Sequence, residues 1–370
     1  MADITASMVK TLREMTGAGM MECKKALTAT EGNVDAAVDW LREKGLAAAQ
    51  KKAGRIAAEG IVKTIVNGRK AAIVEVNSET DFVAKNADFQ NYVEQVAEQA
   101  LDSKSENIEA FLAEPWKFDS SKTVEQELST KISVIGEKLS IRRFAQVNAT
   151  EGPVVSYIHG AGRIGVLVEG KCEADNDDVN EALKNIAMQI AAMNPQYISR
   201  DDMSEEELTK LRKITAESAL NTPDTLPKPI LMRLINQAVD EKVWSEDDIR
   251  IYGEQKNNMQ YLFNFLSDEA KAQLAGLAVA DKENIFADKI FAGLVDGRYA
   301  KQLKDICLLD QVYVRAEDGK QTVSKYLEEV SKKLGTALTI KQVIRFETGE
   351  GMEKRSENFA DEVAAQMAGK

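Results

Sequence analysis

The sequence predicts an α+β protein in which short N-terminal helices precede a region of mixed strands and helices. Apolar residues recur at helical spacing over the first 45 residues, and an Asn-Gly pair near residue 67 separates two runs of strand-forming residues. Further along, strands and helices do not alternate regularly, which argues against a parallel βαβ sheet.

Three short helices are predicted at the N-terminus. Thr5 is placed to cap the first, which stops at Gly17, and the second covers about 20–30. Asn33 caps the third helix, and Gly45 is expected to end it. These helices form a compact module, followed by a basic, alanine-rich connector.

The middle of the chain is predicted to mix hairpins with helices. Asn67-Gly68 is a strong hairpin signal between two β-rich runs, and Pro115-Trp116 marks a break. In order, the expected elements are strands 61–66 and 71–76, helices 89–101 and 123–138, strands 141–147, 154–159 and 164–169, and a helix at 179–193.

From Ser204 onward the sequence is helical and polar, with acidic residues in the first turn. Three of the six prolines cluster at 223–229 and mark a boundary, after which several short helices extend to about 300. The remaining expected elements are a strand at 312–315, a helix at 322–334, a strand at 339–346, a turn at 349–351 and a last helix at about 358–367.

Composition excludes several classes of protein. The net charge of -12 repels phosphate backbones, so no direct contact with nucleic acid is expected. Three widely spaced cysteines argue against a disulfide framework, and no apolar run is long enough to span a bilayer. His159 is the only histidine, so no metal or other cofactor is expected. We expect a cytoplasmic protein with no membrane partner.

Gly160–Gly165 has the G-x-G-x-x-G pattern of dinucleotide-binding loops. Such a loop needs a helix N-terminus directly after it, whereas strand-forming residues follow here. The pattern therefore favours a glycine-rich hairpin turn over a nucleotide site. The sequence contains no Walker-type phosphate loop.

Two further segments have both a structural and a functional interpretation. Met20 and Met21 are adjacent, so a helix does not turn both to the same side; one is expected to fill the core, and the other suits an adaptable protein interface. Residues 80–85, T-D-F-V-A-K, are either a helix start with Phe82 in the core or a projecting loop that presents an acid beside an apolar ring. The residues alone leave this choice open.

Five segments together resemble translation elongation factor Ts, and they occur in the order found in that family. They are ITASMVKTLREMTGAGMMECKKAL (4–27), TDFVAKNADF (80–89), IGEKLSIRR (135–143), YIHGAGRIGVL (157–167) and IRFETGEGME (344–353). The resemblance covers residues 1–220 and 282–370.

The resemblance implies a fold with a ubiquitin-associated-like three-helix module, two α+β core subdomains, a protruding helical hairpin and a C-terminal helix. The implied boundaries are 1–55 for the module, 56–148 for the N-terminal core subdomain, 149–203 with 301–350 for the C-terminal one, 204–300 for the hairpin and 351–370 for the C-terminal helix.

The resemblance also implies a function, which is guanine-nucleotide exchange on elongation factor Tu by a protein that is not itself an enzyme. One segment would approach the partner's magnesium and phosphate site and promote GDP release, namely Thr80, Asp81, Phe82 and Val83. The residues that match partner contacts of the family are Arg13, Met20, Met21, Lys24, Lys52, Ile135, Gly136, His159 and Val314. Arg315 departs from the methionine expected beside Val314.

One segment departs from the family pattern. The family's hairpin is usually short, whereas residues 221–281 form an extra segment near its tip, and Trp244 with the apolar cluster at 261–265 predicts that this segment folds. The hairpin is also a candidate contact for a homodimer. The alternatives to exchange are a binding adaptor built on the N-terminal module and a nucleotide-dependent enzyme that uses Gly160–Gly165.

Overall fold

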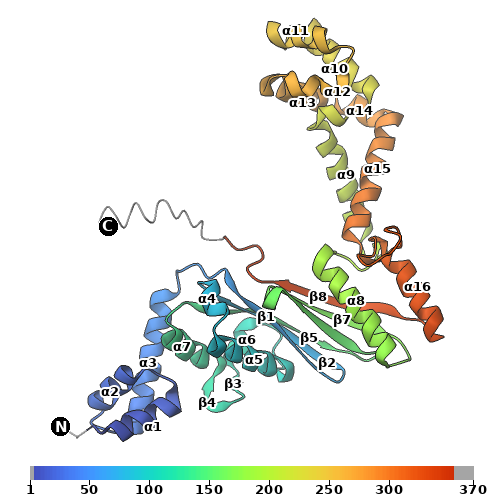
Figure 1. The fold of residues 1–370 in the computed structure, drawn as a ribbon. Coiled ribbons are helices and arrows are strands. Elements are labelled where there is room, and N and C mark those ends of the chain that lie inside the picture. The colour runs from blue at the N-terminus through green and yellow to red at the C-terminus, as the bar shows by residue number, and fades with distance from the viewer. Residues whose placement is uncertain (1–3, 354–370) are drawn as a thin grey trace. The chain divides into compact units, whose positions relative to one another are not determined.

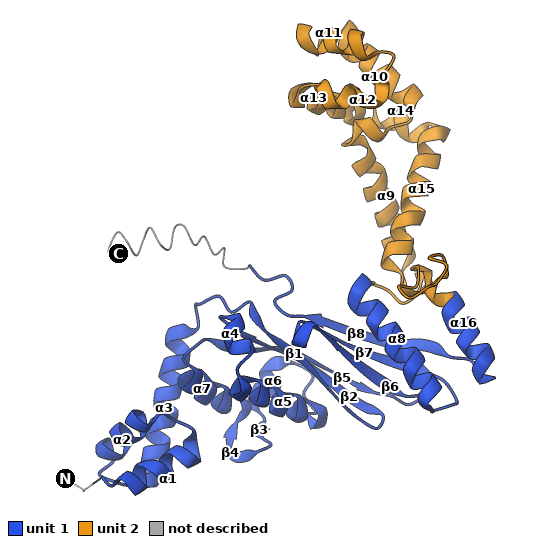
Figure 2. Ribbon diagram, in the orientation of Figure 1, with its two compact units in different colours: residues 1–194, 325–370 blue, residues 195–324 orange. Residues whose placement is uncertain are grey.

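The computed structural model describes residues 4–353, which divide into two compact units (Figures 1 and 2). Unit 1 comprises residues up to 194 and from 325 onward, and unit 2 comprises residues 195–324. The predicted α+β class is confirmed, since unit 1 combines antiparallel sheets with helices and unit 2 is helical over most of its length. The subdomain boundaries implied by the resemblance stay a prediction.

The N-terminal module consists of three helices, as predicted: α1 (Ala6–Thr16), α2 (Met20–Ala29) and α3 (Val34–Lys52). Thr5 and Asn33 cap α1 and α3, because their side-chain oxygens accept hydrogen bonds from free backbone N–H groups of the first turn. The helices enclose a small apolar core of Val9, Leu12, Cys23, Ala26, Leu27 and Ala37.

The predicted end of the third helix at Gly45 is wrong, since α3 continues to Lys52. Gly45 lies inside the helix, where α3 packs on α7 (Val124–Ile135). A Cβ atom at Gly45 would lie 3.3 Å from the Ser129 carbonyl oxygen, which is tighter than ordinary packing. The glycine therefore permits close approach of two helices and does not mark a helix end.

The first sheet has the order β1-β2-β5, all antiparallel, with β1 (Glu59–Asn67), β2 (Lys70–Ser78) and β5 (Leu139–Asn148). The predicted hairpin is confirmed, although Asn67 pairs with Lys70, so the turn consists of Gly68 and Arg69. Helices α5 (Ala87–Asp102), α6 (Ile108–Ala113) and α7 share an apolar core with this sheet. The short hairpin of β3 (Pro115–Trp116) and β4 (Asp119–Thr123) leads into α7.

The second sheet has the antiparallel order β6-β7-β8, with β6 (Val154–His159), β7 (Ile164–Lys171) and β8 (Thr339–Glu347). Helix α8 (Asp177–Met193) packs on β6 and β7, and α16 (Val323–Leu334) joins α8 through a 3.1 Å hydrogen bond from Asn185 to Tyr326. The two sheets share a core of Val62, Ala71, Ile73, Val147, Ala149, Val154, Leu167 and Phe346.

Gly160–Gly162 forms a short 3₁₀ turn, η1, between β6 and β7. Because β7 starts directly after this turn, no helix N-terminus faces the glycines. The predicted hairpin turn is confirmed, and the geometry that a dinucleotide loop needs does not occur at Gly160–Gly165.

A buried carboxylate ties the end of β8 to the first sheet. The Glu75 side chain is fully buried and accepts hydrogen bonds from Arg142 Nη1 (3.0 Å), Arg143 Nε (2.6 Å) and Gly349 N (2.8 Å). Gly349 has a φ of +69°, and a Cβ atom there would lie 2.2 Å from the Ala58 carbonyl oxygen, so only glycine fits. Two of the segments quoted for the family resemblance thus meet at Glu75.

Unit 2 is built on α9 (Glu205–Leu220) and α15 (Lys289–Ile306), which lie side by side (Figure 2) and are joined by an Arg212–Asp296 ion pair of 2.6 Å. Between them in the chain lie α10 (Lys228–Asp240), α11 (Glu246–Gln255), α12 (Met259–Phe265), α13 (Asp268–Ala280) and α14 (Lys282–Ala287). Short 3₁₀ turns complete the unit at Arg200–Asp202, Pro223–Thr225 and Leu308–Asp310.

The 221–281 segment folds, as predicted. Trp244 is buried, and its indole N–H donates to the Ala270 carbonyl oxygen at 3.1 Å. The aromatic cluster divides: Leu262 is buried, whereas Tyr261 and Phe265 are exposed. The core of this segment also includes residues outside it, namely Ala219, Leu220, Ile285, Phe291 and Val295.

The strand predicted at Val312–Arg315 is wrong. Val312 forms an isolated bridge with Thr322 and belongs to none of the strands, and the chain turns where Ala316 N donates to the Tyr313 carbonyl oxygen at 2.9 Å. Alternating burial in this stretch reflects a single buried Tyr313 between exposed valines. The helix predicted at 358–367 lies outside the described residues. Within residues 4–353, none of the helices combines the length and apolar character needed to cross a membrane.

Candidate functional site

The T-D-F-V segment forms a one-turn helix, α4 (Asp81–Ala84), that projects an aromatic ring. Thr80 caps the helix, since its Oγ1 accepts from Val83 N at 3.4 Å. The Phe82 side chain is 80% exposed, whereas Ala84 is buried. Both interpretations of this segment therefore hold in part: it is a helix start with Thr80 as the cap, and it presents Phe82 to solvent.

Asp81 places a carboxylate beside the exposed ring. Lys85 Nζ donates to Asp81 Oδ2 at 2.6 Å across one helical turn, and both side chains are exposed. This hydrogen bond is the main reason that the pKa of Asp81 lies below its usual value. The segment thus presents an ionised acid next to a large apolar group.

Glu137 anchors the start of α4 from a segment distant in sequence. Its Oε2 accepts from the backbone N–H groups of Glu79 and Thr80, both at 3.1 Å, and its Oε1 accepts from the Thr80 hydroxyl at 2.7 Å. Glu137 directly follows Gly136, which ends α7 in the left-handed conformation. The turn after α7 therefore holds the turn before α4.

Glu79, in the turn before α4, in turn accepts hydrogen bonds from the turn after α7. Its Oε1 accepts from Lys138 N at 2.6 Å, and Arg55 Nη1 donates to the same oxygen at 3.2 Å. Lys138 Nζ in turn donates to the carbonyl oxygens of Ala53 and Arg55, both at 2.7 Å, just beyond the end of α3. We call Glu79, Thr80, Glu137 and Lys138 the carboxylate clasp.

The clasp brings together three of the segments predicted from the resemblance. They are the end of α3 with Lys52, the end of α7 with Ile135 and Gly136, and the Thr80–Val83 segment. Sequence reasoning did not single out Glu79 or Glu137. The only available signal was the position of Glu137 inside the I-G-E-K segment.

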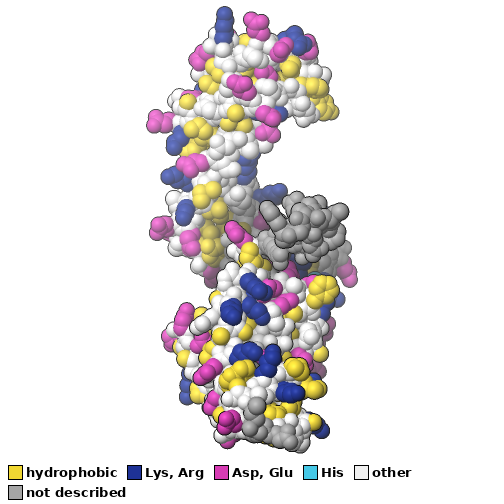
Figure 3. Space-filling model, turned by 90° about the vertical axis from the view of Figure 1, so that its left-hand side faces the viewer, with side chains coloured by type: hydrophobic (Ala, Val, Ile, Leu, Met, Phe, Trp, Pro, Cys, Tyr) yellow, Lys and Arg dark blue, Asp and Glu magenta, His cyan; other side chains and the backbone are white. Residues whose placement is uncertain are grey.

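The N-terminal module exposes both methionines at the start of α2. Met20 is 61% and Met21 65% exposed, so the expectation that one of them fills the core is wrong. Cys23 and Ala26 face the core instead. Arg13 and Lys24 are exposed and Lys52 is half-buried. In the lower part of Figure 3, which is unit 1, Lys and Arg side chains lie among hydrophobic ones.

The remaining predicted contacts lie on other elements. Ile135 is half-buried and Gly136 exposed at the end of α7. His159 is exposed at the end of β6, and its Nδ1 lies 3.0 Å from the Tyr157 hydroxyl. Val314 is exposed and belongs to unit 2.

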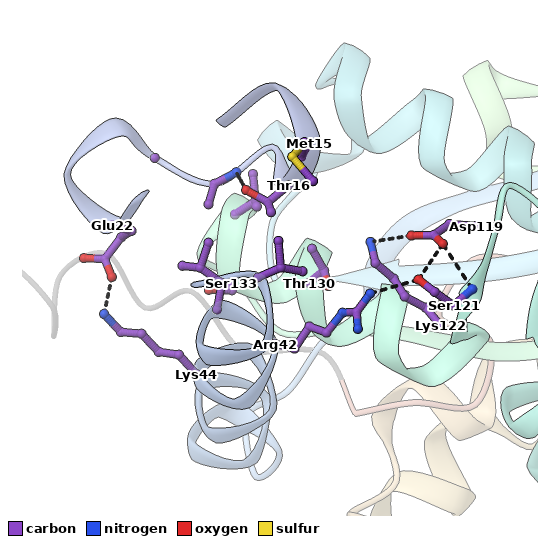
Figure 4. Close-up of a pocket in the computed structure, with 15 residues that line it drawn as sticks. Met15, Thr16, Glu22, Arg42, Lys44, Asp119, Ser121, Lys122, Thr130 and Ser133 are labelled. Atoms are coloured by element: carbon purple, nitrogen blue, oxygen red, sulfur yellow. Dashed lines mark hydrogen bonds and ion pairs between the residues drawn. The ribbon is translucent and has the colours of Figure 1, made fainter. Parts of the chain in front are cut away.

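A cavity of about 520 Å³ lies between the N-terminal helices and the β4–α7 region (Figure 4). Its apolar lining includes Met15 and Val134, and its charged groups pair within it, as Lys44 does with Glu22 and Lys122 with Asp119. None of its lining residues is a histidine or cysteine. The lining connects α2, through Glu22, with the last turns of α7, through Ser133 and Val134.

Two family models match the chain. The model described as elongation factor TS matches residues 79–350, and the one described as UBA/TS-N domain matches residues 4–41. The chain is also similar to curated proteins named elongation factor Ts. It is 44% identical to that of Clostridium perfringens (strain SM101) and 42% identical to that of Clostridioides difficile (strain 630). Each alignment spans 369 residues, 99% of this chain and 100% of the relative.

Proposed function

The chain belongs to the elongation factor Ts family, and from this premise we propose that it is the guanine-nucleotide exchange factor of elongation factor Tu. In this proposal it binds the GDP-loaded GTPase, perturbs the magnesium and phosphate site, and promotes GDP release during translation elongation. It supplies binding energy and geometry and makes or breaks no covalent bond.

The physical basis of exchange is thermodynamic linkage. A factor that binds the empty GTPase more tightly than the loaded one lowers the affinity for nucleotide by the same ratio. Magnesium and backbone contacts to the phosphates hold a nucleotide in such GTPases. A side chain that displaces one of these contacts therefore accelerates release.

The observation that carries this proposal is the exposed Asp81–Phe82 pair on a helix of one turn. Phe82 is 80% exposed, and covering its ring with a partner surface would be favourable because it removes apolar area from water. In the proposal, Phe82 inserts beside the partner's magnesium site and Asp81 perturbs the ion's surroundings. Thr80 and Val83 hold these two residues in place.

Affinity is proposed to come from a wider contact surface. Its residues are Arg13, Met20, Met21, Lys24, Lys52, Ile135, Gly136, His159 and Val314. Met20 and Met21 suit this role because a flexible thioether side chain adapts to a partner surface. The proposal places the protein in the cytoplasm with elongation factor Tu as its partner and no direct contact with nucleic acid or membrane.

A homodimer through unit 2 is part of the same proposal. The exposed Tyr261 and Phe265 stand one helical turn apart on α12 and offer an aromatic surface for a second copy. Light scattering of the chain with Tyr261→Ser and Phe265→Ser would then report a smaller mass than that of the unaltered chain.

The test is release of labelled GDP from elongation factor Tu, followed with and without the protein. Faster release that saturates with protein concentration is expected. Calorimetry of the protein alone with GDP and GTP separates the alternatives. Micromolar nucleotide binding by the chain itself would favour a nucleotide-dependent enzyme. Tight binding to elongation factor Tu without faster release would favour an adaptor.

A further inference from the structure

The position of Phe82 is not set by contacts of its own ring. The ring is mostly in solvent, and α4 has only four residues, too few to be stable as an isolated helix. Val83 and Ala84 pack on the core beneath it. The backbone at the start of α4 must therefore be held by other groups if the ring is to point in one direction.

We propose that Glu137, through the carboxylate clasp, is a positioning residue that fixes the direction in which Asp81 and Phe82 project. This inference rests on the proposed exchange function and adds a residue that acts through Thr80 and does not itself touch the nucleotide site. Its three hydrogen bonds, of 3.1, 3.1 and 2.7 Å, all end on Glu79 and Thr80. Hydrogen bonds to a carboxylate are stronger than those between neutral groups.

The clasp fixes orientation because its bonds are reciprocal. Glu137 accepts from the backbone before α4, and Glu79, which belongs to that backbone, accepts from Lys138 N at 2.6 Å. The Thr80 hydroxyl donates to Glu137 and accepts from Val83 N, so a single side chain links the clasp to the helix cap. Rotation of the Thr80 backbone would break several of these bonds together.

The clasp also couples two proposed contact regions. Glu137 follows Ile135 and Gly136 directly, and the backbone of the same turn holds Glu79. For a partner that docks on the end of α7, Phe82 therefore lies at a fixed distance and direction from that docking point. Small misplacement of a reacting group has large kinetic effects, so loss of the clasp should lower the exchange rate more than the affinity.

Glu137→Ala tests the inference, and Glu114→Ala is the matched control. Glu114 also accepts three side-chain hydrogen bonds, from Ser103, Ser105 and Gln99, and none of them reaches residues 79–84. The maximal rate of GDP release at saturating factor should fall about tenfold in Glu137→Ala and remain at the wild-type value in Glu114→Ala. The affinity for nucleotide-free elongation factor Tu should change less than threefold in both.

A second readout needs no exchange activity. Hydrogen–deuterium exchange of a peptide spanning residues 79–85 should accelerate in Glu137→Ala and not in Glu114→Ala, because only the first loses bonds to that backbone. If Glu137→Ala does not fold, Thr80→Val replaces it. Valine keeps the shape of threonine and removes only the hydroxyl that joins Glu137 to Val83.

The outcomes separate this inference from the proposed function. If the unaltered chain does not accelerate GDP release, the proposed function fails. The hydrogen–deuterium exchange result then tests by itself whether the clasp orders residues 79–85. If the unaltered chain is active and both Glu137→Ala and Thr80→Val keep its maximal rate, Glu137 is not a positioning residue. Unchanged deuterium uptake at residues 79–85 in Glu137→Ala would overturn the inference in either case.

Discussion

The Thr80–Val83 and Glu347–Gly351 segments both lie in stretches that resemble the elongation factor Ts family, but their surroundings in the structure differ. The first exposes Phe82 and Asp81 on one helical turn. The second wraps around a fully buried Glu75, which accepts from Gly349 N and from two arginines of β5. The first segment presents side chains to solvent, and the second ties the two sheets of unit 1 together.

This difference shows that a strong family motif does not by itself identify a contact. Carboxylates organise both places, but Glu137 holds a projecting element whereas Glu75 is covered by its arginines. A substitution should therefore affect exchange in one segment and folding in the other.

Glu75→Ala should cause the largest loss of stability. Removing the carboxylate leaves Arg142 and Arg143 without their buried partner, and breaking such a pair costs about 3–5 kcal/mol. Urea unfolding of unit 1 measures the loss. At a temperature where the variant is folded, its maximal GDP-release rate should match that of the wild type. A stable variant with slow release would show that the Glu347–Gly351 segment also contributes to exchange.

Met20→Ala with Met21→Ala should weaken binding to elongation factor Tu by about tenfold or more, since a few buried anchors carry most interface energy. The maximal release rate at saturating factor should not change, because the two methionines lie away from α4 in the chain. Lys25→Ala is the control, since Lys25 is exposed on α2 and pairs with Glu22. An unchanged affinity in the double variant would remove α2 from the contact surface.

Replacement of residues 221–281 by a Gly/Ser link should leave a folded, exchange-active protein, because the segment proposed to drive exchange, Thr80–Val83, lies in unit 1. The link joins the end of α9 to the start of α14, which lie close together, since Lys282 pairs with Glu217 at 3.9 Å. The cost of closing such a loop grows only slowly with its length. Leu220 and Phe291 share a core with the deleted residues, so Leu220→Ser and Phe291→Ser should accompany the deletion. A folded product without exchange would show that the segment belongs to the exchange machinery.

The smallest effect concerns Glu114 and pH. Burial alone would raise its pKa, but the hydrogen bonds from Ser103, Ser105 and Gln99 outweigh burial and lower it. A depressed folded-state pKa stabilises the protein above the unfolded pKa, and this contribution is lost as the pH falls through the folded value. Thermal melts should therefore show a weaker decline at acid pH for Glu114→Gln. Identical acid profiles would contradict this.

Local signals predicted most elements because the groups that cap or turn a chain lie close together in it. The caps at Thr5 and Asn33 and the hairpin near Asn67-Gly68 are of this kind. Gly45 misled the prediction, since a glycine that ends a helix and one that admits a neighbouring helix look alike in sequence. Val312 misled it as well, since alternating burial does not require a partner strand.

The candidate site was only partly predictable for the same reason. The exposed Asp81–Phe82 pair lies on one segment that stands out in the sequence. The clasp that holds it joins Thr80 to Glu137 across 57 residues, and no local pattern marks such a pair. Which methionine faces outward depended on the packing of α2 as a whole, and both do.

The most direct test of the account is the maximal rate of GDP release from elongation factor Tu with the Asp81→Ala and Phe82→Ala double variant at saturating concentration. We expect this rate to fall by about thirtyfold, equivalent to ~2 kcal/mol, while the affinity falls much less. Glu114→Ala serves as the folding control. A double variant that releases GDP at the wild-type rate with unchanged affinity would contradict the claim that the projecting α4 segment drives exchange.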